Sequence, residues 1–209
     1  GMKMRRTIKR THAGSLVVGE LPEGCKLCIE GAKLVLFVTG LCDKKCYYCP
    51  LSENRRGKDI VYANEALVKK DEDIIKEAKL MDALGAGITG GDPLLRTRRT
   101  LRYIKILKKA FGKDFHIHLY TSGTRVNVQI LRLLEKAGLD EIRFHTSKSH
   151  WDVIKLATRT RIVVGGEMPA IPGEENELIE YAKFLENVGA SFLNLNELEF
   201  CETNAQQLK

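Results

Sequence analysis

The stretch KLVLFVTG at 33–40 is a short apolar, β-branched run that ends in a polar turn. It is the first of six such runs, and an amphipathic stretch with helical spacing follows each of the first five. Strands that alternate with helices in this way imply parallel strands joined by right-handed crossovers. The sequence therefore predicts an α/β fold, either an open doubly wound sheet or a barrel, and periodicity alone does not distinguish the two.

The expected elements divide the chain into an N-terminal extension over 1–32 and a core domain over 33–209. The chain stops at CETNAQQLK, about where a sixth helix should begin, which leaves open that the natural core continues further. Several helices are expected to stop at glycines, which can adopt the left-handed conformation that ends a helix: Gly85, Gly112, Gly138 and Gly189. The expected strands are 33–40, 85–91, 115–121, 140–146, 161–170 and 191–200, and the expected helices are 64–84, 97–111, 127–137, 151–158 and 175–188.

Composition predicts a cytoplasmic protein without a membrane segment. The N-terminal KMRRTIKRTH lacks the apolar run of a signal peptide, and the longest apolar stretch, LVLFV at 34–38, is far shorter than the ~20 residues that span a bilayer. In a reducing compartment, clustered cysteines are more typical of metal binding or redox chemistry than of disulfides. The net charge of +7 permits an acidic partner such as RNA, although the basic residues form only short clusters, RRGK at 55–58 and RTRR at 96–99.

Three cysteines follow the first predicted strand in TGLCDKKCYYCP, with the spacing C-x3-C-x2-C: Cys42, Cys46 and Cys49. A cubane iron–sulfur cluster has four irons that each take a protein thiolate, so three cysteines leave one iron open for another ligand. A structural zinc site is the alternative, because Cys25 and Cys28 can bring the number of thiolates to four. Ordinary buried cysteines are the third interpretation.

This loop resembles that of the radical S-adenosylmethionine superfamily, including an aromatic residue, Tyr48, just before the third cysteine. The resemblance covers about residues 33–200 and implies a partial (β/α)6 TIM-type barrel of parallel strands. It also implies a [4Fe-4S] cluster on the three cysteines, S-adenosylmethionine on the open iron, and cleavage of this cofactor to a 5'-deoxyadenosyl radical. A one-electron reductant such as a ferredoxin or flavodoxin is implied as a partner.

Within the superfamily, the chain is most similar to archaeal proteins related to the activating enzyme of pyruvate formate-lyase. The segments that carry this similarity are VLFVTGLC, ANE at 63–65, GITGGDPL, FHIHLYT and LNELEF. The similarity suggests hydrogen abstraction from a substrate such as a glycyl residue of a partner protein. Two alternatives stay open, an RNA-modifying radical enzyme with RRGK and RTRR at the barrel mouth, and a non-catalytic iron–sulfur or zinc-binding protein.

The carboxyl ends of the other strands carry the remaining candidate cofactor residues, because chemistry gathers at this end of a parallel barrel. The family resemblance assigns the TGGDP segment, with Gly90, Gly91 and Asp92, to the amino group of S-adenosylmethionine. Thr121 and Ser122 are expected to meet its ribose or carboxylate, or else to cap the next helix.

The last three strands add further candidates at the barrel mouth. His145 ends the fourth strand and is interpreted either as a cofactor or substrate ligand or as a structural histidine. Glu167 lies among glycines and prolines, where the family often has a polar contact to ribose or substrate. Asn194 and Asn196 share one face of the sixth strand, and their amides need partners from a bound adenosyl group or from a network with neighbouring backbone.

Cys25 and Cys28 form a C-x2-C pair outside the core motif, and Cys201 follows the sixth strand. The pair is interpreted as half of a zinc site or of a second cluster, as a redox dithiol, or as small buried hydrophobes.

Overall fold

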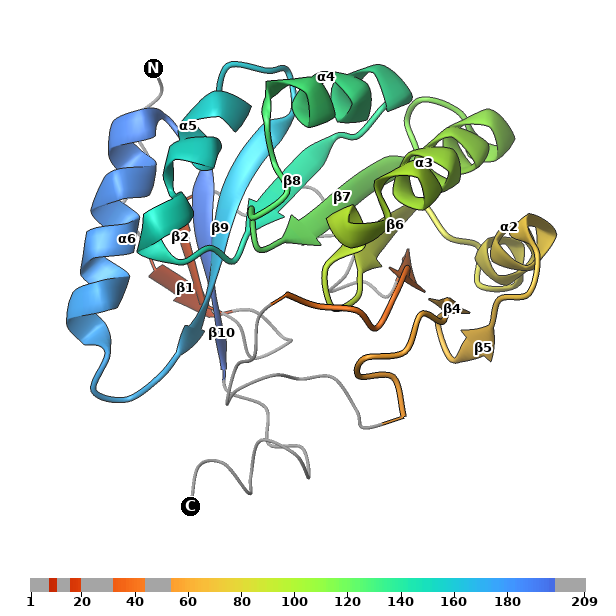
Figure 1. Ribbon diagram of the computed structural model, residues 1–209, viewed down its shortest axis with the longest axis horizontal. Coiled ribbons are helices and arrows are strands. Elements are labelled where there is room, and N and C mark those ends of the chain that lie inside the picture. Colours follow the sequence, from red (N-terminus) through yellow and green to blue (C-terminus); the bar gives the residue numbers. More distant parts are fainter. Residues whose placement is uncertain (1–7, 11–15, 20–31, 44–53, 198–209) are drawn as a thin grey trace.

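The computed structural model describes residues 8–10, 16–19, 32–43 and 54–197, and its central feature is one curved sheet (Figure 1). In the described residues the strand order is β1-β2-β10-β9-β8-β7-β6-β3-β4-β5, so β1 and β5 form its two edges and the sheet does not close. Six neighbouring strands run parallel, which confirms the predicted partial barrel. These are β3 (Lys33–Phe37), β6 (Gly85–Thr89), β7 (His116–Thr121), β8 (Glu141–Phe144), β9 (Val163–Ala170) and β10 (Phe192–Glu197).

Two strands lie in the N-terminal extension, where the sequence was expected to form none: β1 (Ile8–Arg10) and β2 (Leu16–Gly19). That expectation was wrong because β2 pairs antiparallel with β10 and so lengthens the sheet beyond the six predicted strands. The boundary between extension and core at residue 32 stays a prediction.

The predicted helix over 64–84 is shorter in the structure, where α2 is Asp71–Leu80. A small hairpin of β4 (Tyr62–Ala63) and β5 (Ala66–Leu67) precedes it. Asn64 turns this hairpin with a φ of 53°, and its side chain accepts a hydrogen bond from the backbone of Val35. Asp73 fixes the helix start, because its carboxylate reaches back to accept from the backbone N–H groups of the N-cap Lys70 and of Lys69 before it.

The helices form an arc along the outer side of the sheet (Figure 1). Gly138 and Gly189 adopt the predicted left-handed conformation after α4 and α6, and Gly112 follows α3 with a φ of 92°. Gly85 was wrongly predicted to end a helix: α2 ends at Leu80, and Gly85 is the first residue of β6. The remaining helices are α3 (Thr97–Phe111), α4 (Val128–Ala137), α5 (Asp152–Ala157) and α6 (Glu175–Val188), with short 3-10 turns η1 (Pro93–Arg96) and η2 (Lys148–His150).

The two faces of the sheet differ in chemistry because successive side chains of a strand point to opposite sides. Apolar residues such as Leu36, Leu119 and Leu193 form a continuous core with the helices. The alternate residues, including Arg143 and Asn194, make the inner face polar, and these residues are buried as well. Among the described helices, none is long and apolar enough to cross a membrane.

Candidate functional site

The cysteine loop begins directly after β3, at the carboxyl edge of the parallel strands. Cys42 is exposed there. Cys46, Tyr48 and Cys49 lie outside the described residues, as do Cys25, Cys28 and Cys201. Within the described part of the chain, no three His, Cys, Asp or Glu side chains gather as a metal site. The ligand set therefore stays a prediction, and the structure shows how the start and the return of the loop are held.

The start of the loop is clamped between two backbone segments. On one side, Gly40 donates to Lys58 O at 2.7 Å, and a β-carbon at Gly40 would lie 1.7 Å from the carbonyl oxygen of Arg55. On the other side, Gly91 donates to Thr39 O at 2.8 Å, and a β-carbon at Gly91 would lie 2.1 Å from the carbonyl oxygen of Leu41. Only glycine lets the backbones approach this closely.

Asp59 anchors the segment that returns from the loop. Its carboxylate accepts hydrogen bonds from both Arg99 and Arg96 and from the Thr39 hydroxyl at 2.8 Å. The Arg99 guanidinium holds the pKa of Asp59 well below its ordinary value, despite partial burial. The two basic clusters RRGK and RTRR therefore meet beside Asp59, as the RNA hypothesis required. Three of their arginines are however engaged in ion pairs: Arg55, Arg96 and Arg99.

Asp92 joins the ends of β6 and β7. Its carboxylate is 0% exposed and accepts from the backbone of Leu94 at 3.0 Å, which caps η1. It also accepts from the Thr121 hydroxyl at 3.0 Å and from the Ser122 hydroxyl at 2.5 Å. Both hydroxyls thus donate to Asp92. The alternative that they cap the next helix was wrong, because Asn127 caps α4.

Glu167, Asn194 and Asn196 come together on the inner face, on neighbouring strands β9 and β10. Asn194 Nδ2 donates to Glu167 at 3.0 Å, and Asn196 Nδ2 donates to it at 2.5 Å. Burial raises the pKa of Glu167 above its ordinary value. The two amides therefore bind the Glu167 side chain, whereas the alternative expected a network with neighbouring backbone. The buried Asn194 Oδ1 has no hydrogen-bond partner among the described residues, so it can accept from an amino or hydroxyl group of a ligand.

Arg143 is the central inner-face residue that sequence reasoning missed. It is 1% exposed, and its Nε donates to Glu141 at 2.6 Å. Its Nη1 donates to the Tyr120 hydroxyl at 2.7 Å and lies 3.5 Å from Glu167 Oε1. The alternation in the strand at 140–146 could have indicated that Glu141 and Arg143 share a face.

His145 follows β8 at the edge where the strands end. Its backbone N–H donates to the carbonyl of Thr121 at 2.9 Å, which brings the ends of β7 and β8 together. The structure therefore confirms the position of His145 at the rim, and its role as a ligand stays a prediction.

A second polar cluster missed by the sequence analysis lies at the opposite end of the strands. Lys33 Nζ contacts His116 Nδ1 at 2.9 Å and His118 Nδ1 at 2.5 Å. Burial lowers the pKa of His116 to about 4, and burial also lowers the pKa of His118 well below its ordinary value. Both rings are therefore neutral near pH 7, and their Nδ1 atoms accept hydrogen bonds from the Lys33 amino group.

This cluster predicts a loss of stability in mild acid. The pKa of His116 is 6.5 in the unfolded chain and about 4 in the folded protein. Between these two pH values the unfolded chain therefore binds more protons than the folded protein. The thermal midpoint should therefore fall as the pH drops from 6.5 towards 4. We expect His116→Gln to flatten this slope. Equal slopes for the wild type and this variant would contradict the assignment.

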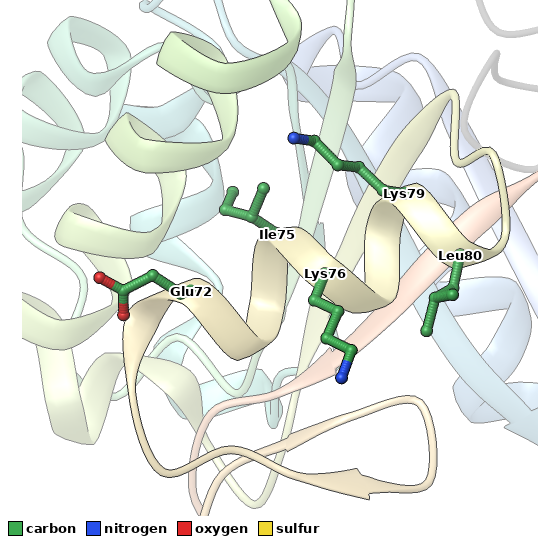
Figure 2. A pocket seen from close by; sticks show the side chains of 5 residues that line it. All are labelled: Glu72, Ile75, Lys76, Lys79 and Leu80. Carbon is green, nitrogen blue, oxygen red and sulfur yellow. The ribbon is translucent and has the colours of Figure 1, made fainter.

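A surface pocket lies on the outer side of α2 and is unrelated to this site (Figure 2). None of the predicted site residues lines it. Its lining residues all come from one helix: Glu72, Ile75, Lys76, Lys79 and Leu80.

The partial parallel barrel and its cysteine loop define a radical S-adenosylmethionine fold. Residues 36–145 match the family model described as the radical SAM superfamily, and the chain belongs to this superfamily. Membership implies a [4Fe-4S] cluster and S-adenosylmethionine. The residues present fit these groups, because Cys42 is accessible at the mouth and Asn194 presents a buried acceptor on the inner face.

A protein of Methanocaldococcus jannaschii is 48% identical over 202 residues and bears the provisional name of a glycyl-radical enzyme activating enzyme. The alignment covers 91% of this chain and 53% of that protein, so the chain spans about half the length of the curated relative it matches. This finding confirms the expected similarity to archaeal proteins related to activating enzymes.

Solved structures share the fold at low sequence identity. SuiB of Streptococcus suis bound to S-adenosylmethionine has a TM-score of 0.61 and 15% identity, over 85% of this chain and 44% of SuiB. Coproporphyrinogen III oxidase of Escherichia coli, described as a radical SAM enzyme, has a TM-score of 0.53 and 13% identity, over 90% of this chain and 50% of the oxidase. These similarities support the fold alone.

Proposed function

We propose that this chain is the radical-generating core of an activating enzyme, which abstracts hydrogen from a glycyl residue of a partner protein. The observation that carries the proposal is the clamp on the cysteine loop, where Gly40 and Gly91 hold the backbone before Cys42 at the mouth of the barrel. The name of the archaeal relative supports the class of substrate.

In this proposal Cys42, Cys46 and Cys49 hold three irons of a [4Fe-4S] cluster. When bound, the cluster supplies one electron that splits S-adenosylmethionine into methionine and a 5'-deoxyadenosyl radical. Carbonyls of Gly90 and Gly91 receive the amino group of this cofactor, because glycines let a ligand approach the backbone.

The inner-face residues orient the nucleoside part of the cofactor. Asn194 Oδ1 accepts a hydrogen bond from an amino or hydroxyl group, while Glu167 holds the Asn194 amide in place. Thr121 and Ser122 act through Asp92, to which they donate, rather than by direct contact. Tyr48 and His145 complete the proposed set of cofactor contacts.

A one-electron donor of the ferredoxin or flavodoxin class is the proposed reductant. The RNA-modifying alternative has weaker support, because ion pairs engage Arg55, Arg96 and Arg99 in the two basic clusters. An auxiliary zinc or second cluster on Cys25 and Cys28 also stays a proposal, since both residues lie outside the described part of the chain.

The test is reductive cleavage of S-adenosylmethionine by the chain, purified without oxygen and reconstituted with iron and sulfide. With dithionite as reductant, we expect 5'-deoxyadenosine by mass spectrometry. A variant with Cys42→Ala, Cys46→Ala and Cys49→Ala should give only the background amount, because no site for the cluster remains.

Two controls make the outcome decisive. Iron content shows whether the cluster is filled, and equilibrium dialysis shows whether S-adenosylmethionine binds. A filled cluster with bound cofactor and no 5'-deoxyadenosine above the triple variant would overturn the proposal in favour of a non-catalytic binding protein.

A further inference from the structure

We propose that Asp43 and Thr124 are positioning residues that fix the first cluster cysteine, Cys42, against the end of β7. The inference rests on the proposed function, because it concerns the site that would hold the cluster. Thr124 Oγ1 donates to Asp43 Oδ2 at 2.5 Å, across a sequence separation of 81 residues. Asp43 directly follows Cys42, so this contact holds the loop on the far side of the cysteine from the glycine clamp.

The other neighbour of Cys42, Leu41, is held by Asp92, which in turn binds Ser122 in the loop after β7. The backbone N–H of Asp92 donates to Leu41 O at 2.8 Å, and the carboxylate of Asp92 accepts from the Ser122 hydroxyl at 2.5 Å. Ser122 and Thr124 are two residues apart in the loop after β7. The Ser122 hydroxyl therefore donates to Asp92, which holds the residue before Cys42. The Thr124 hydroxyl donates to Asp43, the residue after Cys42.

The geometry of the loop after β7 supports this double role. Gly123 separates the two hydroxyl residues with a φ of 85°, a left-handed conformation that favours glycine. Its N–H donates to Thr121 Oγ1 at 3.1 Å, which ties the turn to the strand end. Arg125 Nε lies 3.8 Å from Asp43 Oδ2 and adds a weaker attraction to the same carboxylate.

Together these contacts form a closed ring around Cys42. The ring runs from Leu41 through Asp92 to the loop after β7, and returns from there through Asp43. Hydrogen bonds between a hydroxyl and a carboxylate are shorter and stronger than those between neutral groups. Partners that orient metal ligands from outside the ligand set affect metal retention strongly, typically by 10–100-fold.

The test is cluster retention in Thr124→Val, which removes the hydroxyl at nearly constant shape. We expect iron loss to a chelator to be about 10-fold faster than in wild type, and a shifted spectrum and midpoint potential of the reduced cluster. Thr124→Ser restores the hydroxyl and should restore all three values. Thr158→Val is the matched control, because among the described residues the Thr158 hydroxyl bonds only to the carbonyl of Lys155 in the helix it follows.

A second variant, Asp43→Asn, keeps the test valid if Thr124→Val does not fold. Asp43 is on the surface and its replacement weakens the same contact, so it should shift the potential in the same experiment. A folded variant that matches wild type in iron loss, spectrum and potential overturns this inference alone. A wild-type chain that takes up no cluster overturns the proposed function, and the inference falls with it.

Discussion

Gly91→Ala is expected to lower the yield of 5'-deoxyadenosine by about 10²-fold, the order of loss that ~1 Å of misplacement causes at a reacting centre. The new β-carbon would lie 2.1 Å from the carbonyl oxygen of Leu41 and 3.0 Å from Cβ of Cys42. The backbone of the cysteine loop has to move away, because neither contact involves the far end of a flexible side chain. Single-turnover assays with a filled cluster measure the loss.

A matched variant separates this local effect from a general loss of stability. Overpacking at Gly91 costs about 1–3 kcal/mol. Gly189→Ala costs a similar ~1–2 kcal/mol, because Gly189 is left-handed at the end of α6, but a β-carbon there meets no atom within 4 Å. We expect Gly189→Ala to keep its yield, and equal losses in both variants would refute the role of Gly91 in the clamp.

Arg143→Met is expected to lower the free energy of unfolding by about 3–5 kcal/mol, because it leaves buried carboxylates without their cation. Glu141 and Glu167 are both buried and both lie beside this guanidinium. At roughly 2–4 °C per kcal/mol for a chain of this size, the thermal midpoint should drop by about 6–20 °C. Calorimetry on the chain provides the measurement.

A double variant tests whether the loss comes from the unpaired charge. Combining Arg143→Met with Glu141→Gln removes one of the two carboxylates, so it should recover part of the stability lost in Arg143→Met. Lys148→Met breaks the exposed pair with Glu180 and should cost at most about 1 kcal/mol. If Arg143→Met costs no more than Lys148→Met, the inner-face network contributes no special stability.

The sequence predicts much of the architecture because its elements have clear local signals. The predicted helix at 97–111 matches α3, and the helix at 175–188 matches α6, since both have strong apolar periodicity. The helix predicted over 64–84 was too long at its start. The charged stretch before α2 continues the helical pattern of the sequence, but in the structure Asn64 turns a hairpin. A single left-handed residue carries no periodic signal.

For the candidate site, too, some positions follow from the chain order, but the contacts between side chains depend on how distant segments are placed in space. The place of Asp92 could be predicted, because the chain order alone puts the end of β6 at one edge of the sheet, whereas Glu167 lies within β9. The partners of these residues were missed or misassigned. Whether Tyr120 meets Arg143 depends on the register of β7 and β8, and whether Asp43 meets Thr124 depends on how two loops fold towards each other.

The pairing of β2 with β10 has a consequence for how the protein is made. The parallel strands lie in the sheet in the order in which they leave the ribosome, from β3 to β10, so each new strand can join the edge of those already formed. Strand β2 is synthesised before all of them, yet the parallel strand that it pairs with is the last. During translation β2 cannot pair with β10 until nearly the whole core has been synthesised, so the sheet is complete only after β10 has emerged.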